Sequence, residues 1–262
     1  MTRVLSGAVL IAIAIAVIWF APPLVFFAVA IAFAIAGAHE LVALAHASGI
    51  AVPRLPSELG AGLVLVATHT AMPIGAVTVA LLAVFIALAL ATLGAWRGGP
   101  DAMASVSASL LPSIYVALPI AALVSIRVRE GPAALFLLIA TIIVSDTAQY
   151  YAGRLVGQRP LAPSISPKKT IEGAVAGFLF GGLALTVAGG WWLPDLPVAL
   201  RVALGLAVVA LGIAGDLFES MLKRSAGVKD SSSLIPGHGG VLDRIDALLF
   251  AAPVYFIVVT YA

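Results

Sequence analysis

Long apolar runs follow one another along almost the whole chain, and they constrain its fold more than any other feature. A helix needs about 20 apolar residues to cross the hydrocarbon core of a bilayer. Runs of this kind predict nine spans, at 4–20, 24–45, 59–72, 75–95, 103–126, 133–152, 171–190, 198–218 and 245–262. We therefore expect an all-α, polytopic integral membrane protein that forms a single membrane domain over 1–262.

The number of spans depends on one division of the sequence. The run 59–95 is too long for one crossing, and it is divided here at Met72-Pro73. Proline can also merely kink a membrane helix, so eight spans is the alternative. The run 198–218 can continue as helix beyond the membrane face. The first run ends in Trp19-Phe20 without a small-residue cleavage site, which favours a span over a cleaved signal peptide.

The composition excludes several classes of protein. Of the 262 residues 62% are hydrophobic and only 10% are charged, whereas about 25% are charged in a typical soluble domain. The net charge of +2 is too small to indicate a nucleic-acid partner. Because the chain has no cysteine, disulfides, thiolate catalysis and cysteine–zinc sites are also excluded.

The basic residues predict the orientation of the spans. With nine spans, eleven of the 14 Lys and Arg residues fall on one side of the membrane and three on the other. Cytoplasmic loops carry the excess of Lys and Arg. We therefore expect a protein of the inner (plasma) membrane, with the long polar loops 153–170 and 219–244 in the cytoplasm.

Polar chemistry is concentrated in 141–250, whereas 1–130 consists of apolar helices with thin connections. Asp216, Ser220 and Lys223 have the i, i+4, i+7 spacing of one helix face. Asp243 and Asp246 have the i, i+3 spacing where the last span begins. Carboxylates brought together at a membrane surface repel one another unless a cation lies between them, and oxygen ligands of this kind suit Mg²⁺.

A glycine-rich turn at 237–240 precedes the last span. Backbone N–H groups in such a turn, together with the following helix N-terminus, favour an anion. Nearby cations suited to phosphate oxygens are Lys223, Arg224, Lys229 and Arg244. Carboxylates, cations and a glycine turn together are what phosphoryl or nucleotidyl transfer requires.

These residues form a recognisable motif. The pattern Ser-x2-Lys-Arg-x4-Lys-Asp-x5-Pro-x-His-Gly-Gly-x2-Asp-Arg-x-Asp, from Ser220 to Asp246, resembles the signature of the phosphatidate cytidylyltransferases. A second block, from Ser145-Asp146-Thr147 to Lys168-Lys169-Thr170 and Glu172-Gly173, is similar to the other polar block of that family. Pro167 would favour a helix start there. The resemblance covers about 141–250.

The resemblance implies an enzyme that transfers CMP from CTP to phosphatidic acid with Mg²⁺, and it suggests a homodimer. The residues expected to be catalytic are Asp216, Asp243, Asp246, Lys223 and His238. Those expected to bind substrate are Lys168, Lys169, Thr170, Ser220, Arg224, Lys229, Gly239, Gly240 and Arg244. The expected metal ligands are Asp216, Asp243 and Asp246, with Asp146 as a further member.

Three other functions are weighed against this interpretation. A secondary transporter would have polar residues near the bilayer midplane and repeated halves, but here they cluster at one face and the halves differ. A related enzyme acting on an isoprenoid lipid phosphate, or a lipid kinase, is the second alternative. The Asp-Gly-x2-Ala-Arg signature of CDP-alcohol phosphatidyltransferases is absent. Glu40, near the cytoplasmic end of the second span, is expected to be structural.

Overall fold

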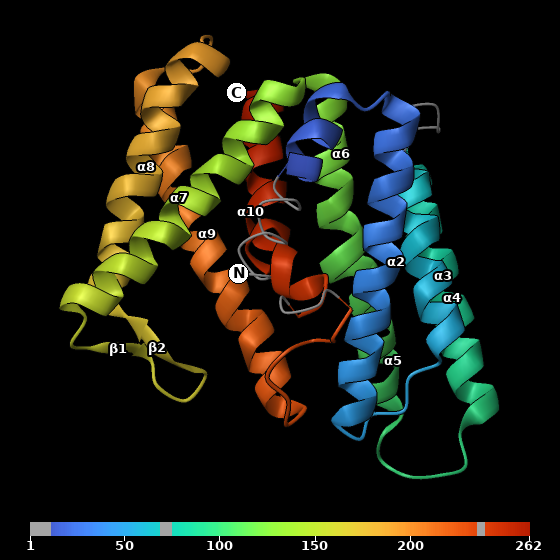
Figure 1. The fold of residues 1–262 in the computed structure, drawn as a ribbon. Helices are drawn as coiled ribbons and strands as arrows, with labels where there is room; N and C mark the ends of the chain where they lie inside the picture. The colour runs from blue at the N-terminus through green and yellow to red at the C-terminus, as the bar shows by residue number, and fades with distance from the viewer. Residues whose placement is uncertain (1–11, 69–74, 235–238) are drawn as a thin grey trace. The chain divides into compact units, whose positions relative to one another are not determined.

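The computed structural model describes residues 12–68, 75–234 and 239–262, and most of them are helical. After a helical segment at 12–20, the elements are α2 (Pro23–Ala47), α3 (Arg54–Ala67), α4 (Ala76–Ala95), α5 (Ala102–Leu111), the π-helix η1 (Pro112–Ala117), α6 (Leu118–Arg129), α7 (Pro132–Val156), β1 (Pro160–Ala162), β2 (Ser166–Thr170), α8 (Ile171–Trp192), α9 (Val198–Ser225) and α10 (Leu242–Tyr261) (Figure 1). The helical fold was predicted, and the short antiparallel hairpin of β1 and β2 was not.

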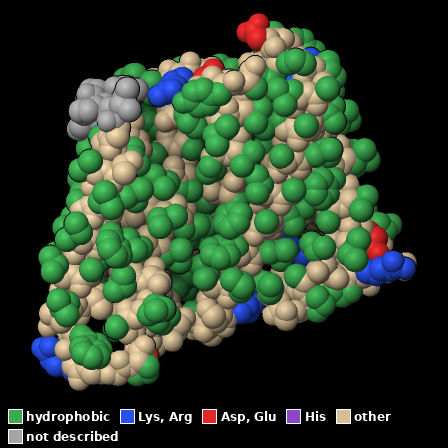
Figure 2. All heavy atoms as spheres, turned by 180° about the vertical axis from the view of Figure 1, so that it is seen from behind, with side chains coloured by type: hydrophobic (Ala, Val, Ile, Leu, Met, Phe, Trp, Pro, Cys, Tyr) green, Lys and Arg blue, Asp and Glu red, His purple; other side chains and the backbone are tan. Residues whose placement is uncertain are grey.

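Six helices among the described residues are long and apolar enough to cross a membrane. They are α2, α4, the continuous stretch Ala102–Arg129, α7, α8 and α9. Figure 2 shows hydrophobic side chains spread over the whole visible face, with most of the charged ones near its upper and lower edges. The chain is therefore a multi-pass membrane protein.

The predicted count of nine spans is not confirmed. Helix α3 has 14 residues, which gives a rise of only about 21 Å, less than the roughly 30 Å of hydrocarbon in a bilayer. Helix α10 has 20 residues but is not among the six. Part of the first predicted span and the division at Met72-Pro73 lie outside the described residues. Helix α9 continues to Ser225, beyond its predicted span.

The chain divides into two compact units. Unit 1 comprises Met1–Phe26, Ala122–Met221 and Ile245–Ala262, and unit 2 comprises Phe27–Ala121 and Leu222–Arg244. The predicted catalytic region is therefore shared between two packing units. Asp146, Asp216 and Asp246 belong to unit 1, whereas Lys223 and Asp243 belong to unit 2.

In unit 1, glycines allow helices to approach closely. Gly173, Gly177 and Gly181 follow one another at every fourth residue of α8, which places them on one face. A Cβ atom on Gly181 would lie 2.7 Å from Cγ2 of Val209 on α9 and 2.8 Å from Cβ of Ser145 on α7. Helices α7, α8 and α9 therefore meet at Gly181, and Figure 1 shows the three side by side.

The remainder of the unit 1 core is largely apolar, and Tyr255 carries a hydroxyl into it. Leu135, Leu138 and Leu204 are buried in a single cluster with Tyr255. The Tyr255 hydroxyl donates a hydrogen bond of 2.8 Å to the carbonyl oxygen of Ala134. This bond satisfies the one polar atom that the side chain carries into the core and fixes α10 against α7.

Unit 2 has a separate core where α3, α4 and η1 pack. Val64, Val84, Leu88 and Ala117 are buried there. A Cβ atom on Gly60 would lie 2.8 Å from Cγ1 of Val84, so α3 and α4 are in close contact. The short α3 is thus held by packing against its neighbours.

The close contact at Gly181 predicts that a single methyl group there destabilises the protein. Gly181→Ala should lower the midpoint of thermal unfolding in detergent, because overpacking costs about 1–3 kcal/mol and outweighs a helix-propensity gain of at most about 1 kcal/mol. Gly62→Ala is the matched control, since nothing lies within 4 Å of the added atom. Equal midpoints for the two variants would contradict the packing at Gly181.

Candidate active site

The hairpin connects α7 to α8 and carries the predicted phosphate-binding lysines. Thr170 is the N-cap of α8, and its Oγ1 accepts a hydrogen bond of 3.1 Å from the N–H of Gly173. This cap supplies one of the partners that the first turn of a helix lacks. The expectation that Pro167 begins the helix is wrong, because Pro167 lies within β2 and α8 begins at Ile171.

Glu172 ties the hairpin to the first turn of α8. Its Oε2 accepts hydrogen bonds from the N–H groups of Gln158 at 3.1 Å and Arg159 at 3.3 Å. The Ile171 N–H donates in turn to the carbonyl oxygen of Arg159, at 2.9 Å. These bonds join the residues that follow α7 to the first residues of α8 at the base of the hairpin. They therefore fix the position of the Lys169 backbone in β2.

Asp216 is the centre of a charged cluster in unit 1. Its Oδ2 forms an ion pair of 2.5 Å with Nζ of Lys169, and its Oδ1 accepts a hydrogen bond of 3.3 Å from Ser220. The predicted helix face shared by Asp216 and Ser220 is confirmed by that bond. Asp146 on α7 is within electrostatic range of both Lys169 and Asp216, so the two predicted polar blocks meet here.

The backbone of Asp246 on α10 packs against Gly215 on α9, next to Asp216. A Cβ atom on Gly215 would lie 2.5 Å from the carbonyl oxygen of Asp246 and 3.3 Å from Cα of Ala247. Helices α9 and α10 therefore cross in direct contact one residue before Asp216. The Asp246 carboxylate accepts a hydrogen bond from the N–H of Ala247 at 2.7 Å.

The acids of unit 1 fit a magnesium ion only in part. Among the residues that the structure describes, no group of three or more His, Cys, Asp and Glu side chains is placed to hold a metal. Mg²⁺ in nucleotide-dependent enzymes is usually held by one or two carboxylates together with substrate phosphates, and Asp146 with Asp216 supplies that number. A site shared by Asp216 and Asp243 stays a prediction.

Unit 2 contains a second charged cluster, centred on Asp243 at the start of α10. Its Oδ1 lies 2.5 Å from Nζ of Lys223 on α9, and both side chains are almost fully buried. Its Oδ2 accepts hydrogen bonds from the N–H groups of Ser231 and Gly240 and from the Ser231 hydroxyl, at 2.8–2.9 Å.

These partners keep Asp243 ionised. The residue precedes the predicted span 245–262. Burial raises the pKa of its carboxyl, but the hydrogen bonds from Lys223, Gly240 and Ser231 outweigh that effect and hold the pKa below its usual value. The carboxylate is therefore a fixed negative charge at neutral pH.

The glycine turn binds the protein's own carboxylates. The N–H of Gly240 donates to Asp243, and those of Val241 and Leu242 donate to Glu40 on α2. The anion expected at this helix N-terminus is thus a glutamate, and direct phosphate contact by Gly239 or Gly240 stays a prediction. Gly239 has a φ of 79°, which favours glycine. A Cβ atom at this position would also collide with the Asp243 carboxylate.

The remaining predicted cations are exposed, and one predicted residue lies outside the described chain. Lys168, Arg224, Lys229 and Arg244 all expose their side chains. His238 is not among the described residues. Glu40 was missed as part of the polar cluster, although a carboxylate in an apolar run is itself a signal, because such groups are costly in a membrane.

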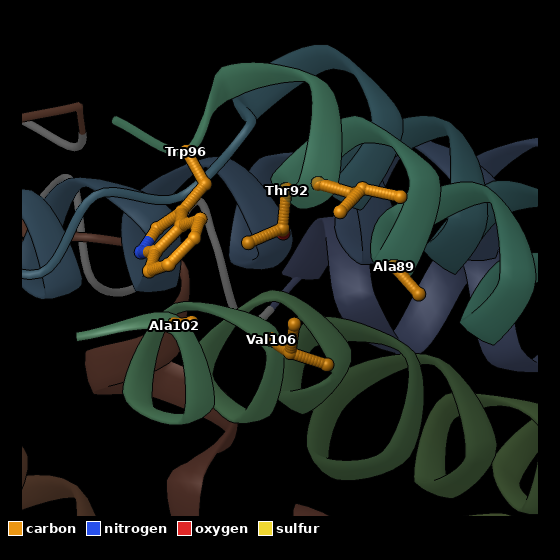
Figure 3. A pocket seen from close by; sticks show the side chains of 6 residues that line it. Ala89, Thr92, Trp96, Ala102 and Val106 are labelled. Atoms are coloured by element: carbon orange, nitrogen blue, oxygen red, sulfur yellow. The ribbon is translucent and has the colours of Figure 1, made fainter. Parts of the chain in front are cut away.

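A separate pocket of about 270 Å³ lies between α4 and α5 (Figure 3). It is lined by Ala89, Thr92, Leu93, Trp96, Ala102 and Val106. None of the predicted site residues borders it, and Thr92 is the one hydroxyl among these side chains. The pocket therefore lacks the charges that a nucleotide requires.

Comparison with known proteins identifies the family. The sequence pattern of the cytidylyltransferase family matches residues 1–262. The chain belongs to this family. Because the members of a nucleotidyltransferase family are enzymes, this match does not support the transporter alternative.

Named relatives of the chain are bacterial phosphatidate cytidylyltransferases. The one from Mycobacterium bovis is 31% identical over 97% of this chain and 85% of its own length. That from Aquifex aeolicus is 44% identical over 47% of this chain and 46% of its own length, and that from Haemophilus influenzae is 43% identical over 46% and 44%. The matched part thus spans about half of the last two relatives.

The Lys223–Asp243 pair predicts coupled losses of stability. Lys223→Met should lower the free energy of unfolding in detergent by about 3–5 kcal/mol, because it leaves a buried carboxylate without its counter-ion. Adding Asp243→Asn should cost about 1–3 kcal/mol less than the sum of the two single losses. The exposed Lys229→Met is the matched control. Additive losses, or an equal loss in the control, would contradict the pairing.

Proposed function

We propose that this chain is a phosphatidate cytidylyltransferase that makes CDP-diacylglycerol from CTP and phosphatidic acid. A phosphate oxygen of phosphatidic acid attacks the α-phosphorus of CTP. A new P–O bond forms there, the bond to the β-phosphate breaks, and pyrophosphate leaves with its electron pair. The observation that carries the proposal is the M. bovis relative of that name, which matches along 97% of the chain.

The chain's own residues have separate tasks in this proposal. The exposed cations Lys168, Arg224, Lys229 and Arg244 bind phosphate oxygens of the two substrates. Lys169, which balances Asp216 in the structure, exchanges part of that contact for the triphosphate. Because both substrates already carry anionic oxygens, no covalent intermediate on the protein is required, and catalysis consists of positioning and charge neutralisation.

The acids of unit 1 are the proposed ligands of Mg²⁺. Asp216 and Asp146 would hold the ion, with Asp246 close by on α10, and bound Mg²⁺ would neutralise charge on the phosphate oxygens. In unit 2, Asp243 and Lys223 form a buried pair. We assign this pair the task of holding the start of α10, where the motif residues Gly240 and Arg244 lie.

We also propose that the protein lies in the inner membrane and that the hairpin and both polar loops face the cytoplasm, where CTP is made. The support is the excess of Lys and Arg on that side of the predicted topology. Phosphatidic acid then reaches the acids and cations laterally from the bilayer, and CTP reaches them from water.

Pyrophosphate release tests the proposed reaction. Purified protein in detergent should release pyrophosphate when CTP, phosphatidic acid and Mg²⁺ are all present, and omission of any one should abolish release. Replacing phosphatidic acid with an isoprenoid phosphate is the control for the related enzyme class. Faster turnover with the isoprenoid phosphate would contradict the proposed lipid substrate.

Metal dependence tests the role of Asp216. In Asp216→Asn the Mg²⁺ concentration for half-maximal turnover should rise by at least about 10-fold, the loss that even indirect partners of a metal ligand impose. Asp195→Asn, an exposed acid between α8 and α9, is the matched control and should leave that concentration unchanged. A lower kcat with unaltered Mg²⁺ dependence in Asp216→Asn would remove it from the metal site.

Thiol labelling tests the orientation, and the absence of native cysteine makes it direct. Ser164 and Asp195 lie near opposite ends of α8. In intact cells Ser164→Cys should resist a membrane-impermeant thiol reagent, whereas Asp195→Cys should react. The reverse pattern of labelling would place the hairpin outside the cytoplasm.

A further inference from the structure

Glu40 is a buried carboxylate that the proposed reaction does not use. It lies on α2 with only 3% of its surface exposed. Its Oε1 accepts hydrogen bonds from the Ser232 hydroxyl at 2.7 Å and the Val241 N–H at 2.9 Å. Its Oε2 accepts from the Ser231 hydroxyl at 2.9 Å and the Leu242 N–H at 2.8 Å.

The arrangement of these donors makes Glu40 a clamp. Each oxygen lies within hydrogen-bond distance of one hydroxyl from the segment after α9 and accepts one backbone N–H at the start of α10. The Ser231 hydroxyl has one proton, which it donates to either Glu40 or Asp243. The carboxylate therefore joins two stretches of chain, Ser231–Ser232 and Val241–Leu242, that are separated by eight residues in sequence. Its negative charge also lies at the N-terminus of α10, where the helix dipole favours an anion.

The clamp extends to Asp243 through Ser231. The Ser231 hydroxyl lies within hydrogen-bond distance of both Glu40 and Asp243, and the Ser231 N–H donates to Asp243. Moving Ser231 would therefore break its hydrogen bonds to Oδ2 of Asp243, whereas the ion pair of Lys223 with Oδ1 would remain. Glu40 and Asp243 are therefore linked through Ser231.

One glycine shows that the local packing is built around this carboxylate. A Cβ atom on Gly240 would collide with both oxygens of Glu40 and with the Ser231 hydroxyl. The absence of a side chain at this motif glycine thus leaves the space that the Glu40 carboxylate fills.

We propose that Glu40 is a positioning residue, which holds the segment after α9 and the start of α10 together, so that Asp243 keeps one orientation and the phosphate-binding Arg244 keeps its place during catalysis. The catalytic part of this inference rests on the proposed function, whereas the clamp itself does not. Glu40 acts through Ser231 and the α10 backbone and touches neither substrate.

Glu40→Gln is the decisive variant. In either orientation of the amide, its NH₂ group faces one hydroxyl and one backbone N–H, so a backbone donor loses its acceptor. We expect kcat to fall on the order of 100-fold, the effect of misplacing a catalytic group by about 1 Å, with little change in the KM for CTP. Glu58→Gln on α3 is the matched control, because the described partners of Glu58 are His39 and Arg54.

A nitroxide attached to Leu234→Cys reports on the clamp without substrates. Leu234 is exposed, two residues after Ser232. We expect Glu40→Gln to increase nitroxide mobility in the electron paramagnetic resonance spectrum, and Glu58→Gln to leave it unchanged. Glu40→Asp, which keeps the charge but shortens the reach, should give intermediate mobility and intermediate kcat. If Glu40→Gln does not fold, Ser232→Ala, which removes one of the donors, takes its place.

Each outcome decides the inference. Increased mobility with reduced kcat supports it. Unchanged mobility overturns the clamp, whether or not kcat falls, and increased mobility with unchanged kcat overturns its catalytic role. If the unsubstituted protein shows no cytidylyl transfer, the proposed function fails, and the nitroxide spectra still decide whether Glu40 holds the two stretches together.

Discussion

The hydrocarbon core of a bilayer supplies no hydrogen-bond partner, and the rest of this structure follows from that constraint. Backbone groups in such a medium must be satisfied within helices, so the described chain is helical wherever it is strongly apolar. Ionisable groups are costly there and need partners. The acids of the candidate site accordingly each have a specific partner, and these partners determine how the helix ends are arranged.

Two clusters illustrate this balance in different ways. In unit 1, Lys169 on a hairpin strand neutralises Asp216 on α9, and both side chains are partly exposed. In unit 2, Asp243 is balanced by the buried Lys223, and the partners of Glu40 among the described residues are hydroxyl and backbone donors. A partly exposed pair can be opened by an incoming phosphate, whereas the buried groups are suited to holding a fixed geometry.

Local spacing predicted much of this site, and long-range contacts explain what it did not predict. The i, i+4 relation of Asp216 and Ser220 and the extension of α9 follow from helical periodicity. The contact of Glu40 with Val241 joins residues about 200 positions apart, and no local pattern encodes it. Pro167 misled because proline is tolerated on an edge strand as well as in a first helical turn, and β2 pairs with β1 in a two-stranded sheet that has only edge strands.

The central claim is that these clusters serve cytidylyl transfer to a lipid phosphate. The most direct measurement follows radioactive phosphorus from CTP when purified protein, Mg²⁺ and phosphatidic acid are incubated together. Label at the α-phosphorus should enter the organic phase with the lipid, and label at the γ-phosphorus should remain in water as pyrophosphate. Recovery of the γ label in the lipid would contradict the claim and indicate a lipid kinase.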